Sequence, residues 1–187
     1  MKSENPVERF KQKAEAVSAV VNDVKSIDEA FRYAVDLTKK QRGTTLVAAG
    51  FSSDEINLLK RRCESSGINF LSEPLRPHAN RIHTALTRAD WGIAETGTLV
   101  IDSAHEDTRI ATMLSETHVA ILPASRITAD AAALKGEIET ILKKDKPSYL
   151  AFITGASRTA DIERVLAIGV HGPKELHILI ADNHVNG

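Results

Sequence analysis

The fold is decided by residues 44–71, TTLVAAGFSSDEINLLKRRCESSGINFL. The apolar run at 44–50 predicts a short strand, and Ser52 and Glu55 have the capping-box spacing that begins a helix. A second short strand is predicted at 68–71. A strand, a helix and a strand in this order predict a βα unit, in which parallel strands are covered by the helix that connects them.

The same alternation continues on both sides of this stretch. Upstream, Ser26 and Glu29 have capping-box spacing at the start of a helix that Gly43 ends. Downstream, further strands are predicted at 98–102, 118–122, 149–153 and 176–181, and helices near 107–116, 129–144 and 159–167. The predicted fold class is therefore α/β, a mainly parallel sheet flanked by helices, with the order of the strands left open.

An N-terminal helix is predicted over residues 1–25, ahead of a single domain at 26–187. Asn5 can cap this helix, and Pro6 suits its first position. Its apolar residues recur three and four positions apart, at Val7, Phe10, Ala14, Val17, Val21 and Val24. We interpret the segment as a helix on the surface of its own domain; a dimer seam, and with it a homo-oligomer, is the alternative.

The composition excludes several classes of protein. The chain has 187 residues, 42% of them apolar, with a formal net charge of −1, so a polyanionic partner such as nucleic acid is not expected. No apolar run approaches the roughly 20 residues of a membrane span, and the N-terminus lacks the apolar core of a secretory signal. We therefore expect a cytoplasmic protein with no membrane span.

One loop carries a candidate catalytic carboxylate. Glu95 stands beside Thr96, Gly97 and Thr98, between two apolar segments. In one interpretation Glu95 is an acid, base or nucleophile and its neighbours bind a ligand. In the other, the loop is a tight turn with Gly97 at positive φ and Glu95 solvated.

Two further loops resemble one another, because each carries Ala-Ser-Arg followed by Thr-Ala-Asp at a predicted strand-to-helix junction. The positive charge of an arginine is unfavourable near a helix N-terminus, because that end of the helix dipole is also positive. A bound anion would interact favourably with both the arginine and the helix. We therefore predict a small anionic ligand, a phosphate or a carboxylate, at these loops. The predicted anion-binding residues are Ser125 and Arg126 in the first loop, and Gly155, Ser157, Arg158, Thr159 and Asp161 in the second.

His171 lies between Gly169 and Gly172, close to the last strand. It is a second candidate catalytic residue, a proton shuttle near neutral pH, or else a surface histidine in a turn. The histidines and carboxylates show no metal-ligand spacing, so no metal is predicted. Cys63 is the only cysteine and is interpreted as structural. A lone cysteine cannot hold an iron–sulfur cluster by itself, so clusters are expected only on partner proteins.

Three stretches resemble the LUD domain family, the lactate-utilisation family: ADWGIAETGTLVIDS (89–103), HVAILPASRI (118–127) and TGASRTADIERVLAIGVHGPKELHILIAD (154–182). The chain departs from many relatives at AHEDTR (104–109), where those are rich in glycine. The resemblance implies a fold of the NagB/RpiA/CoA transferase-like superfamily. It also implies a role in oxidising L-lactate to pyruvate beside iron–sulfur lactate-utilisation subunits. Some CoA transferases of that superfamily use a loop glutamate as nucleophile, which makes Glu95 a candidate by analogy.

Three functional hypotheses follow. In the first, the chain is the cluster-free subunit or accessory of a lactate-oxidising complex, with a cofactor that is unknown. In the second, it is an enzyme acting on a phosphorylated or CoA-linked small molecule, with Glu95 as base or nucleophile and Arg126 and Arg158 as anion clamps. In the third, it is a non-catalytic assembly protein whose pocket is structural.

Overall fold

The computed structural model describes residues 5–142, 149–160, 166–168 and 172–182. In chain order its elements are α1 Pro6–Ala16, β1 Val20–Val24, α2 Ile27–Lys40, β2 Thr45–Ala49, α3 Ser53–Ser65, β3 Asn69–Phe70, the 3-10 helix η1 Arg76–His78, β4 Thr84–Arg88, β5 Trp91–Ile93, β6 Thr98–Asp102, α4 Glu106–Leu114, β7 Thr117–Pro123, η2 Ala124–Arg126, β8 Ile127–Thr128, η3 Ala132–Leu134, α5 Lys135–Leu142, β9 Leu150–Ile153, β10 Arg158–Ala160, β11 Leu166–Ile168 and β12 Glu175–Ala181.

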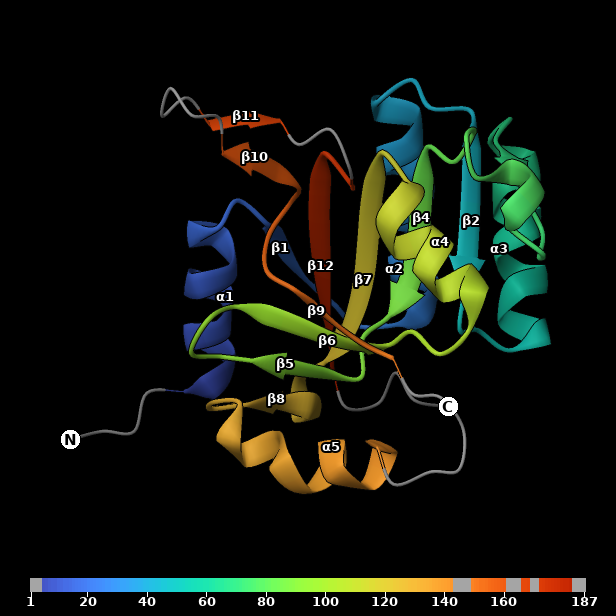
Figure 1. The fold of residues 1–187 in the computed structure, drawn as a ribbon. Coiled ribbons are helices and arrows are strands. Elements are labelled where there is room, and N and C mark those ends of the chain that lie inside the picture. The colour runs from blue at the N-terminus through green and yellow to red at the C-terminus, as the bar shows by residue number, and fades with distance from the viewer. Residues whose placement is uncertain (1–4, 143–148, 161–165, 169–171, 183–187) are drawn as a thin grey trace.

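A six-stranded sheet in the order β1-β12-β7-β4-β2-β3 forms the centre of the molecule, and every neighbouring pair in it is parallel. Its carboxyl ends lie together at the bottom of Figure 1. Parallel sheets are buried on both faces, and their strands are apolar almost throughout, as β7 and β12 are here. The α/β fold class predicted from the sequence is confirmed.

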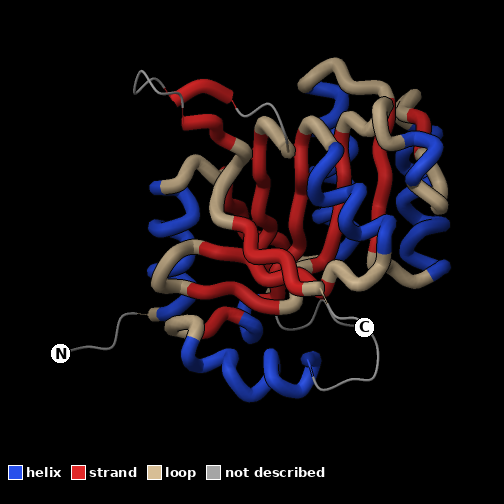
Figure 2. The backbone as a smooth tube through the Cα atoms, viewed as in Figure 1, coloured by secondary structure: helices blue, strands red, loops and turns tan. Residues whose placement is uncertain are grey.

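Two layers cover this sheet (Figure 2). On one face α2 and α3 pack through Phe31, Leu59 and Cys63 against the central strands. On the other face α4 covers β2 and β4, while α1 and strand β6 cover β7 and β12. Phe10 of α1 is fully buried in this second layer, which shows that the N-terminal helix belongs to the core rather than to the surface alone.

A second sheet of four short strands, in the order β8-β5-β6-β9, crosses the lower part of the first (Figure 1). Strands β5 and β6 form an antiparallel hairpin, and β9 adds antiparallel to β6. Strands β10 and β11 form a separate antiparallel pair at the other end of the parallel sheet.

The helix starts follow the local chemistry of the sequence. The Asn5 side chain accepts a hydrogen bond from the Val7 amide, and the Ser26 hydroxyl accepts one from Glu29. Ser52 and Glu55 form the reciprocal capping box that their spacing predicts. The helices at 27–40 and 53–65 therefore begin where the sequence places them.

One predicted helix is shorter than expected, and another is wrong. The N-terminal helix ends at Ala16, Ser18 takes a positive φ of 66°, and residues 20–24 form β1, which pairs with β12 at the edge of the sheet. Valines are β-branched and favour strands, and the partner strand lies more than 150 residues away in sequence. The helix predicted near 159–167 is replaced by β10 and β11.

Candidate functional site

The topology indicates where a ligand would bind. Read along the sheet from β3 to β12, the order is β3-β2-β4-β7-β12. The connection after β2 leads outward to β3, whereas the connection after β4 leads the other way to β7, so the winding reverses between β2 and β4. In open α/β sheets ligands bind outside the carboxyl ends of the strands at such a switch point.

An ion pair with an aromatic neighbour lies at this switch point. Arg88 is the last residue of β4, and its guanidinium pairs with Glu55 on the first turn of α3. The same guanidinium lies 5.0 Å from the centre of the Phe51 ring, in the range of a cation–π contact. Phe51 lines one cavity and Arg88 lines another. The contact between these two side chains therefore lies between the two cavities.

The first cavity, which we call the Arg126 cavity, has a volume of about 470 Å³ and lies where β4 and β7 end. Its lining residues are Arg88, Ala89, Asp90, Trp91, Pro123 and Arg126. Two arginines and one aspartate therefore line the same space. This combination suits a small anion that also carries a hydroxyl or carbonyl group.

Asp90 is held in place by the backbone of β6. Its amide donates to the Val100 carbonyl at 2.9 Å, and one carboxylate oxygen accepts the Asp102 amide at 2.6 Å. Burial raises the pKa of Asp90, while the amide of Asp102 and the charge of Arg126 act in the opposite direction. A carboxyl group with a raised pKa beside two arginines is a candidate for proton exchange with a ligand.

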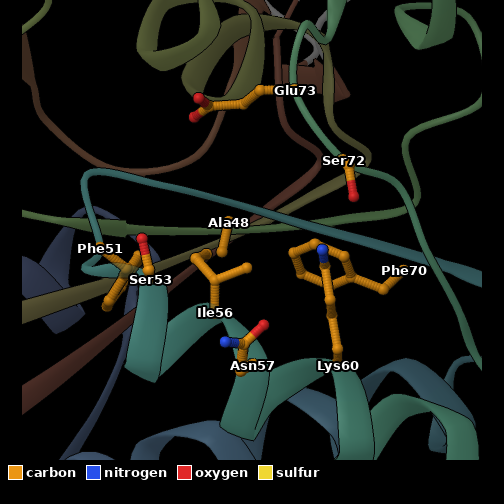
Figure 3. Close-up of a pocket in the computed structure, with 9 residues that line it drawn as sticks. All are labelled: Ala48, Phe51, Ser53, Ile56, Asn57, Lys60, Phe70, Ser72 and Glu73. Carbon is orange, nitrogen blue, oxygen red and sulfur yellow. The ribbon is translucent and has the colours of Figure 1, made fainter.

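The second cavity, which we call the Phe70 cavity, has a volume of about 350 Å³ and lies where β2 and β3 end. Figure 3 shows the side chains of one face of α3 on one side of it and Glu73 on the opposite side. Burial raises the pKa of Glu73, and the nearby Asp107 carboxylate adds to this effect. The full lining is Ala48, Phe51, Ser53, Ile56, Asn57, Lys60, Phe70, Ser72 and Glu73.

The two similar loops of the sequence lie at opposite ends of the parallel sheet. Arg126 follows the carboxyl end of β7, whereas Ser157 donates its amide to the Pro173 carbonyl just before β12 begins. A single small anion therefore cannot contact both loops. Neither loop leads directly into an α-helix: η2 and β8 follow the first, and β10 follows the second. The prediction of two strand-to-helix junctions is wrong, and with it the helix-dipole argument for the anion.

The second loop packs against the end of α1 instead. Arg158 is exposed and lines a cavity with Ser18 and Thr154, beside the last residues of α1. A Cβ at Gly155 would lie 2.2 Å from the Val17 carbonyl oxygen, so this glycine permits close packing. Thr159 lies on β10. Asp161 and His171, the candidate proton shuttle, lie outside the described residues.

The threonines of the Glu95 loop bond to one another. The Thr96 and Thr98 hydroxyls are 2.7 Å apart, and the Thr98 and Thr154 hydroxyls are also 2.7 Å apart, which joins the β5–β6 hairpin to the end of β9. Gly97 has the positive φ expected of a tight turn, at 67°. Glu95 is exposed in this turn, its amide donates to the Ala129 carbonyl, and it lines neither the Arg126 cavity nor the Phe70 cavity.

Arg88 and Asp90 were missed from the sequence, although a signal was present. They flank Ala89 directly ahead of Trp91, where two charged residues follow the short run TALT at 84–87. That run was not recognised as a strand because half of it is threonine. The Thr84 hydroxyl bonds to Thr38 at 2.8 Å, so the polar residues of β4 find partners inside the core.

Metal binding and thiol reactivity are the other kinds of chemistry to consider in the described part of the chain. Its histidines, cysteine and carboxylates form no group of three that could hold a metal ion. Cys63 is fully buried, and burial raises the pKa of its thiol to about 11, which fits its structural interpretation. None of the helices within the described ranges is long and apolar enough to cross a membrane.

The parallel sheet and its switch point define an α/β protein with two cavities at the carboxyl edge of its sheet. A family model described as the LUD domain matches residues 7–181, and the chain therefore belongs to the LUD domain family. The match includes α1 and β1, in agreement with their place in the core.

Relatives match part of the chain, and a solved structure has a similar fold. Lactate utilization protein C of Anoxybacillus flavithermus is 38% identical over 105 residues, which are 56% of this chain and 46% of that protein. The protein of the same name from Bacillus subtilis is 35% identical over 107 residues, 56% of this chain and 45% of that one. The chain thus matches less than half the length of these relatives. A DUF162 family protein from Deinococcus radiodurans has the same fold, with a TM-score of 0.61, 17% identity, and 94% of this chain and 96% of that one covered.

Proposed function

We propose that the chain acts in lactate utilisation, as the cluster-free subunit or accessory of an assembly that oxidises L-lactate to pyruvate. The observation that carries this proposal is the Arg126 cavity, a small space that Arg88, Asp90 and Arg126 line together. Lactate and pyruvate each have a carboxylate that an arginine can bind through paired hydrogen bonds. The relatives named for lactate utilisation add support.

Within this proposal each side chain has a distinct task. Arg126, which is exposed at the cavity rim, binds the carboxylate of the substrate. Arg88 stays paired with Glu55 and offers its remaining guanidinium N–H groups to the ligand as hydrogen-bond donors. Asp90 faces the hydroxyl of lactate and accepts its proton, a task that its raised pKa favours.

The electrons must pass to a partner protein or to a bound cofactor. Oxidation of lactate to pyruvate releases two electrons and two protons, and the single cysteine of this chain cannot hold an iron–sulfur cluster alone. We propose iron–sulfur lactate-utilisation subunits as the acceptors. The proposal predicts that a tagged chain, isolated from cells growing on lactate, carries with it iron and acid-labile sulfide.

A genetic test addresses the role directly. Deletion of the gene is expected to abolish growth on L-lactate while leaving growth on glucose unchanged. The wild-type gene should restore growth on lactate, and Arg126→Gln should restore it poorly, because loss of one hydrogen bond to a charged group weakens binding about tenfold or more.

Arg61→Gln is the matched control for this test, since Arg61 is an exposed arginine on α3 that lines neither cavity. It should restore growth as the wild type does. Normal growth of the deletion strain on lactate would refute the proposed role. Full restoration by Arg126→Gln would refute the assignment of the Arg126 cavity.

A further inference from the structure

The Phe70 cavity is a second place where a ligand fits, and the lactate proposal does not use it. It lies at the carboxyl end of the β2-α3-β3 unit, on the other side of the Arg88–Phe51 contact from the Arg126 cavity. Its volume of about 350 Å³ falls within the range of small-molecule sites, about 300–1,000 Å³.

The cavity has a mixed lining, in which four of the nine residues are apolar and five are polar or charged. Phe51 and Phe70 provide two half-buried aromatic rings, with Ile56 between them in Figure 3. The Lys60 ammonium lies 5.6 Å from the centre of the Phe70 ring, so a cation and an aromatic ring already stand side by side. An aromatic heterocycle can stack against such a surface.

Two exposed polar side chains lie on opposite sides of this space. Asn57 comes from α3 and Glu73 from the segment after β3, as Figure 3 shows. No hydrogen bond or ion pair engages the side chain of Asn57, nor those of Ser53 and Ser72, within the described part of the chain. These groups are therefore available to a ligand at no loss of protein contacts.

We propose that the Phe70 cavity binds an adenosine moiety. An asparagine amide can donate to and accept from the N6 and N7 edge of adenine through two hydrogen bonds. In nucleotide-binding βαβ units, an acidic residue at the end of the second strand bonds to the ribose hydroxyls, about 20 residues after the glycine of the first turn. Glu73 lies close to this position, three residues after β3 ends at Phe70 and 23 residues after Gly50.

The surroundings also limit the proposal to the nucleoside part of a ligand. The first turn of α3 carries Asp54 and Glu55, whose charge disfavours a phosphate at this helix start. The glycine-rich sequence of a pyrophosphate cradle is absent as well. A phosphate on the ligand must therefore extend toward solvent or toward Lys60.

The test measures binding to the full chain by calorimetry, with adenosine, AMP and coenzyme A as probes. At least one of them should bind, and the tightest identifies the source of the adenosine group. Asn57→Ala and Glu73→Gln should each weaken binding about tenfold, the effect of losing a hydrogen bond to a base edge or a charged group. Asn69→Ala is the matched control, because Asn69 is exposed on β3 and does not line the cavity.

A second ligand tests whether Glu73 bonds to the ribose hydroxyls. 2′,3′-Dideoxyadenosine lacks both ribose hydroxyls, so it should bind the wild type about as weakly as adenosine binds Glu73→Gln, and the two changes together should cause no further loss. Absence of binding by all three probes at millimolar concentration would overturn the proposal. So would binding of dideoxyadenosine as tight as that of adenosine, or equal binding by Asn57→Ala and the wild type. None of these outcomes bears on Arg126 or on growth on lactate.

Discussion

Replacement of Gly97 by alanine is expected to lower the free energy of unfolding by about 3 kcal/mol or more. Gly97 has a φ of +67°, which any other residue adopts only with strain. An added Cβ would also lie 2.3 Å from the Ala14 backbone nitrogen. Backbone atoms cannot rotate away, so α1 would have to move and pull Phe10 and Ala14, both fully buried, out of the core.

Gly67→Ala separates the backbone strain from the steric clash with α1. Gly67 has a similar φ of +71°, but nothing lies within 4 Å of a Cβ placed there. This variant should lose only the strain of the left-handed conformation, about 1 kcal/mol. Urea denaturation followed by circular dichroism measures both. Equal losses in the two variants would contradict the close packing of the β5–β6 turn against α1.

His118 is expected to make the protein sensitive to mild acid. It lies on β7, fully buried, with Nε2 2.8 Å from the Thr87 hydroxyl and Nδ1 without a hydrogen-bond partner among the described residues. Burial lowers the pKa of His118 from 6.5 to about 4. The unfolded chain therefore binds this proton first as the pH falls, and stability is lost between about pH 6.5 and pH 4.

The loss amounts to about 3 kcal/mol, since each unit of pKa difference corresponds to about 1.4 kcal/mol. His118→Gln removes the titrating group. Between pH 7 and pH 4 the free energy of unfolding of this variant should therefore fall by about 3 kcal/mol less than that of the wild type. His105→Gln, at an exposed histidine, should keep the wild-type dependence on pH. Urea denaturation at a series of pH values is the measurement. A His118→Gln variant as acid-sensitive as the wild type would refute the burial of a neutral histidine here.

The sequence predicts the elements whose signals are local. The capping residues Ser26 and Ser52 begin helices where predicted, and the apolar runs at 45–49 and 176–181 form central strands. The N-terminal helix was overextended because the spacing of Val17, Val21 and Val24 fits a helix as well as a strand. Only the pairing of β1 with β12, a contact between the two ends of the chain, decides between them.

The candidate site was harder to predict than the fold, because it too depends on contacts between residues that are distant in sequence. Arg126 was identified from its loop, but its neighbours in the cavity, Arg88 and Asp90, lie at the end of a strand rich in threonine. The hydroxyl of Thr87 bonds to His118, and that of Thr84 to Thr38, which are partners distant in sequence. Such pairs make polar residues acceptable in a core, and no local pattern reveals them.

The Arg126 and Arg158 loops are similar in sequence but differ in their place in the fold. Both follow a strand, but β7 is parallel to its neighbours in the central sheet, whereas β9 runs antiparallel to β6. The first loop follows the lower end of β7, whereas the second lies beside Pro173 ahead of β12, at the other end of the parallel sheet (Figure 1). Similar local sequences give the two loops similar side chains. The topology of the fold decides whether those side chains lie close together.

The most direct test of the Arg126 cavity is the dissociation constant of pyruvate, measured by calorimetry for the wild type, Arg126→Gln and Arg158→Gln. Both arginines are exposed, so both variants should fold, and each removes one positive charge. We expect Arg126→Gln to weaken binding about tenfold or more and Arg158→Gln to leave it unchanged. Weaker binding in Arg158→Gln with no change in Arg126→Gln would contradict the account and place the ligand at the other end of the sheet.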